Sequence, residues 1–281
     1  MLSTRNKIRI AAALSAAVRS ARRLGGHSDD IVCVRRDGLR WRLDLNEGID
    51  FTIFLLGTFE RTTMRAYRRL LKPGDVVLDI GANIGAHTLQ FARLVGEHGR
   101  VFAFEPTAFA FAKLLQNLEL NPELCGRVAA KQIMLADRDD AASEAAIYSS
   151  WPLKKVSGLH QGHGGLPKTT AGCRVITLDS FLASTGSSRV DLVKLDVDGF
   201  EWDVLHGGIK SLAVLKPKIL MELSPYVLIE HHHSLGDLLS VLSSGGFRLH
   251  RMNGKLLAMD PGYLNALVPA GKSLNVLAMA H

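Results

Sequence analysis

Short apolar runs alternate with longer amphipathic stretches from about residue 73 to the C-terminus of the chain. The apolar runs predict strands over residues 76–80, 101–104, 128–135, 191–195, 219–223, 247–252 and 274–278. Apolar residues recurring every three to four positions predict helices over residues 86–95, 108–120, 201–215 and 235–243. Strands and helices that alternate in this way form a mostly parallel sheet covered by helices on both faces. The pattern therefore predicts an α/β fold.

The N-terminal part of the chain follows another pattern. Apolar residues at helical spacing within residues 1–24 predict a short amphipathic helix with basic residues on its other face. Residues 31–45 contain two β-rich runs around an Asp-Gly pair, which favours a tight hairpin turn. Residues 58–71 predict a second helix. We therefore expect an N-terminal extension over residues 1–72 and one larger domain over residues 73–281.

One stretch interrupts the alternation of strands and helices. Residues 139–172 are rich in Ser, Gly, Lys and His, and they include Tyr148 and Trp151. A long loop inside a compact domain is typically a lid or a binding loop. The sequence leaves two interpretations open, a loop that faces the substrate through its aromatic side chains or a plain insertion.

Composition places the chain among ordinary globular proteins. Apolar residues make up 47% of it and charged residues 22%. Its three cysteines, Cys33, Cys125 and Cys173, are too far apart for a disulfide framework or a zinc motif, which favours a reducing compartment such as the cytoplasm.

The net charge of +7 is concentrated at the N-terminus. Residues 1–72 hold 15 basic and 7 acidic side chains, whereas residues 73–281 hold 19 and 20. A nucleic-acid enzyme usually spreads basic residues over its active face, so nucleic acid is not the favoured partner. The basic helix within residues 1–24 has two interpretations. It is either a contact with an anionic membrane surface or a partner, or a helix that caps the fold.

The strongest chemical motif is Asp79-Ile80-Gly81-Ala82-Asn83-Ile84-Gly85, between a predicted strand and a predicted helix. Glycines at such a turn let a ligand approach the backbone, and Glu105 stands where a nucleotide-binding fold places the acid that binds ribose hydroxyls. A dinucleotide fingerprint would have glycine in place of Asn83. The motif therefore favours a ligand with a ribose and no pyrophosphate, S-adenosylmethionine, over a degenerate dinucleotide site.

These residues resemble the FkbM family of S-adenosylmethionine-dependent methyltransferases. The resemblance covers roughly residues 40–255 and rests on several short motifs together. Besides the glycine loop, these motifs are Gly57-Thr58-Phe59-Glu60, Phe104-Glu105-Pro106, Thr177-Leu178-Asp179, the stretch from Val190 to Glu201, and Leu220-Met221-Glu222. The resemblance implies a class I methyltransferase fold, a Rossmann-like seven-stranded sheet in the order 3-2-1-4-5-7-6. It also implies O-methylation of a hydroxyl on a small molecule, sugar or polyketide.

The resemblance also implies roles for individual residues. The implied cofactor-binding residues are Asp79, Gly81, Asn83, Gly85, Glu105 and Pro106, with Ala136 and Asp137 at the adenine. The implied residues near the transferred methyl group are Lys194, Asp196 and Glu201. Two positions depart from the family pattern. Asp198 stands where glutamate is more common, and His87 stands where an aromatic or small residue is more common and is expected only to pack.

Asp196 can be assigned independently of the resemblance. It ends the fourth predicted strand, and ligands of such sheets bind beyond the carboxyl ends of the strands. A carboxylate there can accept the proton of an acceptor hydroxyl, or hold a Mg²⁺ ion that acidifies it. Asp198, Glu201 and Glu222 could join it, although Asp198 and Glu201 are alternatively helix-capping acids. No metal ligand set is defined by the sequence.

The function expected from the sequence is therefore a cytoplasmic O-methyltransferase that acts on a small hydroxylated acceptor. Two other functions stay open at this point. One is an RNA methyltransferase guided by the basic N-terminus, and the other is a non-catalytic module that binds S-adenosylmethionine. The run His231-His232-His233 is expected to be a solvated turn, because consecutive side chains point in different directions. The sequence does not indicate an oligomeric state.

Overall fold

The computed structural model describes residues 4–160 and 164–281. Its centre is a seven-stranded sheet in the order β12-β13-β11-β10-β3-β4-β5, in which only β13 runs antiparallel to its neighbours. The strands are β3 (Val76–Ile80), β4 (Arg100–Phe104), β5 (Val128–Lys131), β10 (Leu192–Leu195), β11 (Lys218–Leu223), β12 (Phe247–Arg251) and β13 (Leu274–Ala280). When these seven strands are numbered 1 to 7 along the chain and read from β5 to β12, their order is 3-2-1-4-5-7-6, as predicted.

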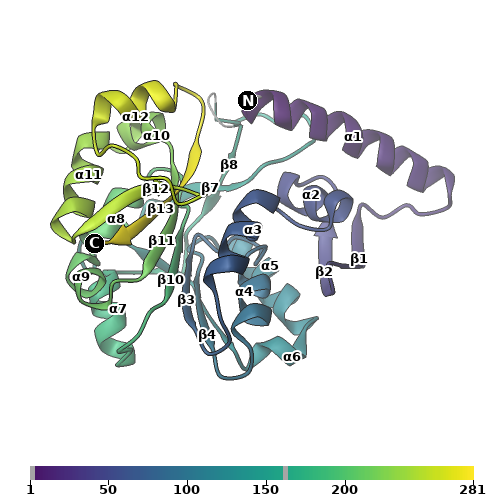
Figure 1. The fold of residues 1–281 in the computed structure, drawn as a ribbon. Coiled ribbons are helices and arrows are strands. Elements are labelled where there is room, and N and C mark those ends of the chain that lie inside the picture. The colour runs from purple at the N-terminus through teal and green to yellow at the C-terminus, as the bar shows by residue number, and fades with distance from the viewer. Residues whose placement is uncertain (1–3, 161–163) are drawn as a thin grey trace.

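Helices cover both faces of the sheet, as predicted (Figure 1). The helices on one side are α2 (Gly48–Leu56), α3 (Arg61–Leu70), α4 (Thr88–Val95), α5 (Ala108–Glu119) and α6 (Pro122–Cys125). Those on the other side are α7 (Leu178–Thr185), α8 (Glu201–His206), α9 (Ile209–Leu215), α10 (Pro225–Glu230), α11 (Leu235–Ser244) and α12 (Pro261–Leu267). No helix within the described residues is both long and apolar enough to cross a membrane.

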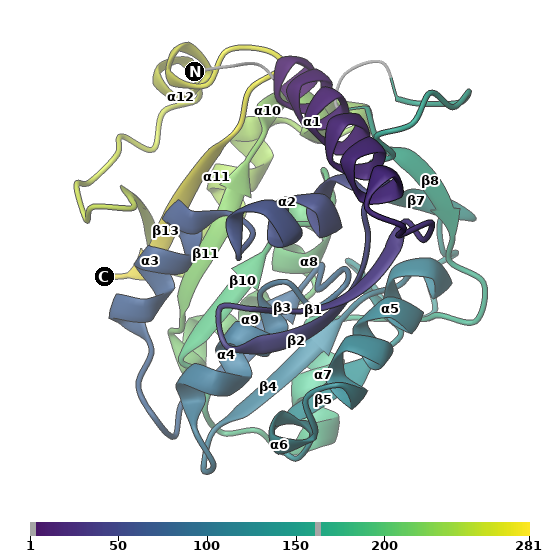
Figure 2. The same ribbon diagram turned by 90° about the vertical axis from the view of Figure 1, so that its right-hand side faces the viewer.

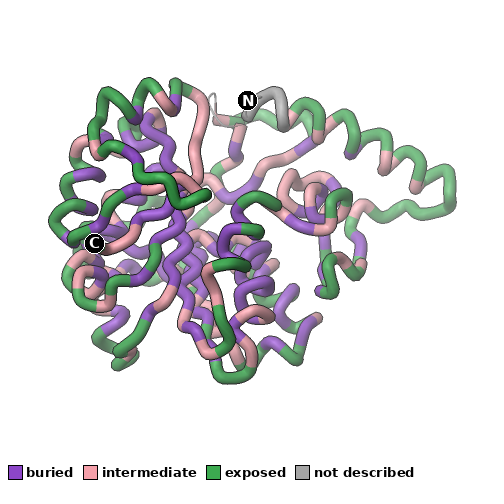
Figure 3. The backbone as a smooth tube through the Cα atoms, in the orientation of Figure 1, coloured by how far each residue is buried: buried purple, intermediate pink, exposed green. Residues whose placement is uncertain are grey.

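Alternate residues of each central strand enter two different hydrophobic cores. Leu78 and Ile80 of β3 face the core that contains α8 and α11, whereas Val77 faces the core that contains α4. This follows from the two-residue period of a strand, and it explains why the central strands read as continuous apolar runs. In Figure 3 the strands through the middle of the molecule are coloured as buried.

The N-terminal residues form α1 (Thr4–Leu24) and a hairpin of β1 (Ile31–Arg36) and β2 (Leu39–Asp44). The hairpin is confirmed, with Arg36 opposite Leu39 and left-handed backbone at Asp37 and Gly38. Its buried Trp41 belongs to the same core as α4. Figure 2 shows α1, α2 and the hairpin lying across the front of the sheet. The boundary after residue 72 stays a prediction.

Several predicted elements differ from the structure. The expected helix over 58–71 begins at Arg61, because Glu60 has left-handed backbone, and α2 precedes it unpredicted. The expected helix over 201–215 is divided at Gly207 and Gly208 into α8 and α9. A Cβ at Gly207 would lie 2.0 Å from the Ala136 carbonyl oxygen, so this close approach requires glycine.

The expected strand over 128–135 is also divided. After β5, β6 (Ile133–Leu135) leaves the main sheet and pairs with β9 (Arg174–Ile176). The stretch over 139–172 is not a plain loop, because it contains a hairpin of β7 (Ala146–Ser150) and β8 (Leu166–Thr169). Residues 161–163 of that stretch, and residues 1–3 of the basic N-terminal segment, lie outside the described residues.

Candidate active site

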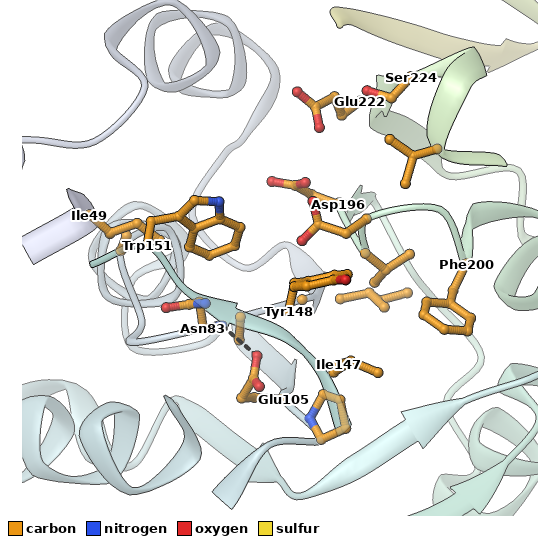
Figure 4. Close-up of a pocket in the computed structure, with 18 of the residues that line it drawn as sticks. Ile49, Asn83, Glu105, Ile147, Tyr148, Trp151, Asp196, Phe200, Glu222 and Ser224 are labelled. Carbon is orange, nitrogen blue, oxygen red and sulfur yellow. Dashed lines mark hydrogen bonds between the residues drawn. The ribbon is translucent and has the colours of Figure 1, made fainter. Parts of the chain in front are cut away.

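A cavity of about 490 Å³ lies at the carboxyl ends of β3, β4 and β10. Gly81 and Asn83 line it from the end of β3, Glu105 from the end of β4, and Asp196 from the end of β10. Figure 4 shows Glu105, Asp196 and Glu222 arranged across the cavity, with the Tyr148 ring between Glu105 and Asp196 in this view. The structure therefore brings together the ends of strands that are far apart in sequence.

The β3–α4 turn approaches the neighbouring strand end very closely. Gly81 has a φ of +81°, and a Cβ there would lie 1.9 Å from the carbonyl oxygen of Asp196. The backbone N–H groups of Gly81 and Ala82 donate to the carbonyl oxygen of Phe104 at 3.1 and 2.9 Å. Asn83, with a φ of +47°, accepts a hydrogen bond from the N–H of Ile84 on its side-chain oxygen. Only glycine fits the first position, and asparagine is among the residues that tolerate the second.

Glu105 is buried at the base of the cavity and is held by several donors. Its two carboxylate oxygens accept from the backbone N–H groups of Asn83 and Thr107, both at 3.0 Å. The hydroxyl of Ser149, on β7, lies 3.4 Å from the same carboxylate. Burial raises the pKa of Glu105 and these hydrogen bonds lower it, with the rise prevailing. Its orientation is thus set by the β3–α4 turn and by the hairpin.

Lys194 is buried between Asp79 and Asp196, two acidic residues that the sequence assigned to the site. It pairs in register with Asp79 on the neighbouring strand, so both side chains point to the same face of the sheet. Its ammonium lies 3.1 Å from Asp196 and 3.9 Å from Asp79, and it donates to the Gly81 carbonyl oxygen at 3.2 Å. Burial opposes its positive charge, but the carboxylates outweigh burial and raise the pKa of Lys194.

Three further carboxylates line the cavity near Asp196, while Glu144 lines it from the segment before β7. The three are Glu60 before α3, Asp198 after β10 and Glu222 near the end of β11. Burial and the charge of Asp196 raise the pKa of Asp198 and of Glu222 well above their usual range. Burial would also raise the pKa of Glu60, but the neighbouring His87 outweighs it and lowers that pKa to about 2.

A cover of three segments closes the other side of the cavity. It consists of α1, α2 and the β7–β8 hairpin, which contribute Ile8, Ala11, Ile49, Tyr148 and Trp151 to the lining. The N–H of Gly48 donates to the Trp151 carbonyl oxygen at 2.9 Å, which ties α2 to the hairpin. The buried Ser15 hydroxyl donates to the Leu45 carbonyl oxygen at 2.6 Å, which ties α1 to the residues after β2.

Some predicted site residues lie next to the cavity rather than in its wall. Asp79 accepts from the Thr88 hydroxyl at 2.6 Å, and a Cβ at Gly85 would meet the Leu114 side chain at 2.7 Å. Glu201 accepts from the N–H groups of Val197 and Gly199 at 3.3 and 3.4 Å, so it organises the turn after β10. The other predicted residues that are absent from the wall are Ala136 and Asp137. Pro106 is part of the wall.

The structure adds residues to the cavity that the sequence did not assign to it. His87 is 4% exposed, its Nε2 lies 3.6 Å from Glu60, and its Nδ1 lies 3.4 Å from the Tyr67 hydroxyl. His231 stacks on Phe200 with ring centroids 3.9 Å apart and also lines the cavity. The expected solvated turn at 231–233 is therefore wrong for His231. For His87 the only hint in the sequence was its departure from the family pattern, and for His231 the sequence held no hint.

The strand order, the glycine turn and the acid at the end of β4 define a class I methyltransferase fold. Residues 79–249 match the family model described as the methyltransferase FkbM domain, and the chain belongs to this family. Glu60 and the cover segments α1 and α2 lie outside the matched range.

Several relatives of this chain are named as methyltransferases. The chain is 32% identical over 163 residues to the 31-O-demethyl-FK506 methyltransferase FkbM of Streptomyces tacrolimicus, covering 49% of this chain and 60% of that protein. It is 27% identical over 200 residues to the 2-O-methyltransferase NoeI of Sinorhizobium fredii, covering 65% and 79%. It is 27% identical over 154 residues to the hexuronic acid methyltransferase AglP of Haloferax volcanii, covering 54% and 58%. The chain thus spans about three fifths of the length of two of these three relatives.

Proposed function

We propose that this protein transfers the methyl group of S-adenosylmethionine to a hydroxyl oxygen of a small molecule, a sugar or a polyketide-type acceptor. The observation that carries the proposal is the meeting of Glu105 and Asp196 in one cavity at the carboxyl edge of the sheet. This is the edge at which α/β sheets of this type bind their ligands. The names of the FkbM and NoeI relatives, which both specify O-methylation, support the same reaction.

The residues at the end of β3 and β4 fit a nucleoside. Glu105 is a fixed carboxylate that can accept hydrogen bonds from ribose hydroxyls. Gly81 and Asn83 line the same cavity, and the missing Cβ of Gly81 lets this turn lie against the backbone of Asp196. We propose Asp79 and Gly85 as the residues that shape this turn, Pro106 as part of its wall, and Ala136 and Asp137 as the adenine side.

Asp196 is proposed to accept the proton of the acceptor hydroxyl. Bound S-adenosylmethionine supplies the methyl carbon, whose bond to sulfur breaks as its bond to the acceptor oxygen forms. The sulfonium becomes a neutral thioether, and the hydroxyl proton passes to the carboxylate. Lys194 positions Asp196 through their 3.1 Å ion pair, and Glu201 positions the turn that follows. Holding the oxygen in line with the methyl carbon is the main task of such a site.

The proposal assigns no step to Mg²⁺. Within residues 4–160 and 164–281, no three acidic, histidine or cysteine side chains are grouped so that they could hold a metal ion. The proposed compartment is the cytoplasm, because the three cysteines are unpaired, as a reducing environment would keep them. A contact of residues 1–24 with a membrane or a partner would use the outer face of α1, where Ile10, Leu14 and Leu24 are exposed.

A labelled-methyl assay on a panel of hydroxylated acceptors, run beside calorimetry with S-adenosylhomocysteine, tests the proposal. Asp196→Asn should lose about 100-fold in transfer while retaining product binding, because only the proton acceptor is removed. Glu105→Ala should weaken product binding by about ten-fold or more, because the ribose loses a charged hydrogen-bond partner. Glu119→Gln, on the exposed surface of α5, is the matched control.

Two results would contradict this assignment. Unchanged affinity of Glu105→Ala would remove the ribose role. Cofactor binding by the native protein without transfer to any acceptor would indicate a binding module instead of an enzyme.

A further inference from the structure

The part of the cavity near Asp196 is a wall of carboxylates. Glu60, Asp196, Asp198 and Glu222 come from three separate places in the chain, the turn before α3, the turn after β10 and the end of β11. All four line the cavity, and the Glu60 and Asp196 side chains are 27% and 28% exposed. These charges therefore act inside a partly enclosed space, where they are screened less than on the open surface.

The cationic groups of the wall are already engaged. Lys194 is the one lysine or arginine among the described residues that line the cavity, and its ammonium is held by Asp196, Asp79 and the Gly81 carbonyl oxygen. His87 faces Glu60 on one ring nitrogen and Tyr67 on the other. The ring of His231 stacks on Phe200, and burial lowers its pKa, which favours the neutral form. Among the side chains that the structure describes, no free positive group is therefore left in this wall for an anionic ligand.

The grouping of four carboxyl groups in one cavity disfavours further negative charge there. Burial and the repulsion of Asp196 hold the pKa values of Asp198 and Glu222 well above their usual range. An entering carboxylate or phosphate would meet the same repulsion and the same loss of water. A neutral hydroxyl compound would not be repelled and would lose less hydration than an ion, and an ammonium group would be attracted.

The cover presents the opposite character. Ile8 and Ala11 of α1, Ile49 of α2 and the indole of Trp151 form an apolar side of the same cavity, and Figure 4 shows Ile49 beside Trp151. An aromatic side chain of this kind packs well on the apolar face of a ring. The two walls together suit a molecule with one apolar face and a hydroxyl edge.

We propose that the cavity selects neutral or amine-bearing alcohols with an apolar face and rejects acceptors that carry a carboxylate or a phosphate, with Glu60 and Glu222 as the residues that set this selectivity. The proposal rests on the proposed O-methyl transfer and adds the acceptor class to it. It also disfavours nucleic acid as the acceptor, because every nucleotide carries a phosphate.

Two matched sets of acceptors test this selectivity. One set is methyl glucoside, methyl glucosaminide and methyl glucuronide. The other is cyclohexanol with a methyl, an amino or a carboxylate group on the ring carbon opposite the hydroxyl. For the native protein, kcat/KM for the anionic member of a set should be about ten-fold or more below that of the neutral member. Equal or faster transfer to the anionic member would overturn the proposal, and no transfer to any of the six would overturn the proposed function beneath it.

Substitutions of Glu60 and Glu222 test whether these two residues cause the preference for neutral over anionic acceptors. Glu60→Gln and Glu222→Gln should each bring the anionic-to-neutral ratio closer to one by about three-fold or more, because each removes an acid whose ionised form repels an anion and keeps the side-chain shape. Glu119→Gln on α5 should leave the ratio unchanged. The ratio compares two acceptors in one protein, so a general loss of activity does not affect it. If the carboxylates instead serve the positive sulfonium, both variants will weaken S-adenosylmethionine binding with the ratio unchanged, and the selectivity proposal fails.

Discussion

The sheet edge and the cover form two sides of one cavity but are built by different means. The sheet edge contains left-handed backbone at Gly81, Asn83 and Asp198, and buried acids such as Glu105 with raised pKa values. The cover is joined by hydrogen bonds such as Ser15 to Leu45 and Gly48 to Trp151, and its buried acid, Asp50 of α2, is paired with Lys113 at 2.6 Å. Most of the outer face of α1 is exposed, as Figure 3 shows.

The difference indicates where the structure tolerates unfavourable local features. Left-handed backbone at a non-glycine residue and a buried carboxylate both destabilise the folded state, and they persist where the surrounding structure holds them. At the sheet edge they are held by two hydrophobic cores. The cover has no such support on its outer side. We therefore expect changes at the sheet edge to have large effects on folding and cofactor binding, and changes in the cover to have small and local ones.

The largest expected effect is that of Gly81→Ala. The new Cβ would overlap the Asp196 carbonyl oxygen, and the alanine would be held in a left-handed backbone conformation. We therefore expect the free energy of unfolding to fall by roughly 3 kcal/mol or more. Binding of S-adenosylhomocysteine should be lost. Urea unfolding and calorimetry measure the two quantities.

Gly57→Ala is the matched control for this change. Gly57 has a φ of +82°, close to that of Gly81, but no atom lies within 4 Å of its added Cβ. Gly57→Ala should lower the free energy of unfolding by only about 1 kcal/mol, the cost of placing alanine in a left-handed backbone conformation, and product binding should be retained. Equal effects of the two variants would mean that the close approach to Asp196 does not matter, and the contrast between the two regions would lose its main support.

A smaller effect is expected from Glu201, through the pH dependence of stability. Burial raises its pKa from 4.5 to about 7, so the folded protein binds more protons than the unfolded chain between these pH values. The contribution of Glu201 to stability should therefore fall by about 3 kcal/mol as pH rises from about 4.5 to 7.

Urea unfolding at pH 5 and pH 8 checks this sign. The native protein should lose more stability between the two values than Glu201→Gln does, because the amide does not ionise. Other buried acids contribute equally to both proteins and cancel in the comparison. Parallel pH profiles would show that Glu201 is not a strained buried acid.

The smallest effect is expected in the cover, from Ser15→Ala. The substitution removes the hydrogen bond to Leu45 and leaves that carbonyl oxygen without its donor, at a cost of about 1 kcal/mol. Hydrogen exchange should become faster in α1 and stay unchanged in β3, with cofactor affinity retained. Ser20→Ala, at an exposed position of the same helix, should change neither. If exchange also became faster in β3, the cover and the sheet would unfold as one unit. That result would contradict the expectation that changes in the cover have only local effects.

The residues that the sequence identified well are those whose role is local in the chain. The strands β3, β4, β10 and β11, the turn around Gly81 and the acid Glu105 all follow from period, spacing and turn chemistry within short segments. The divided elements were not visible, because the break at Gly207 depends on how closely the backbone of Ala136 approaches it. The β7–β8 hairpin was missed as a structure because its strands are short and β8 contains a proline.

The amino-acid sequence by itself determined the α/β class and the chemistry at the ends of β3, β4 and β10, since alternating patterns and glycine turns act over a few residues. The order of the strands was implied by the resemblance to the FkbM family. Only the tertiary structure decided that Glu60 meets His87 and that α1 and Trp151 line the same cavity. These contacts join segments far apart in the chain. They depend on how the cover packs on the sheet, which no local pattern records.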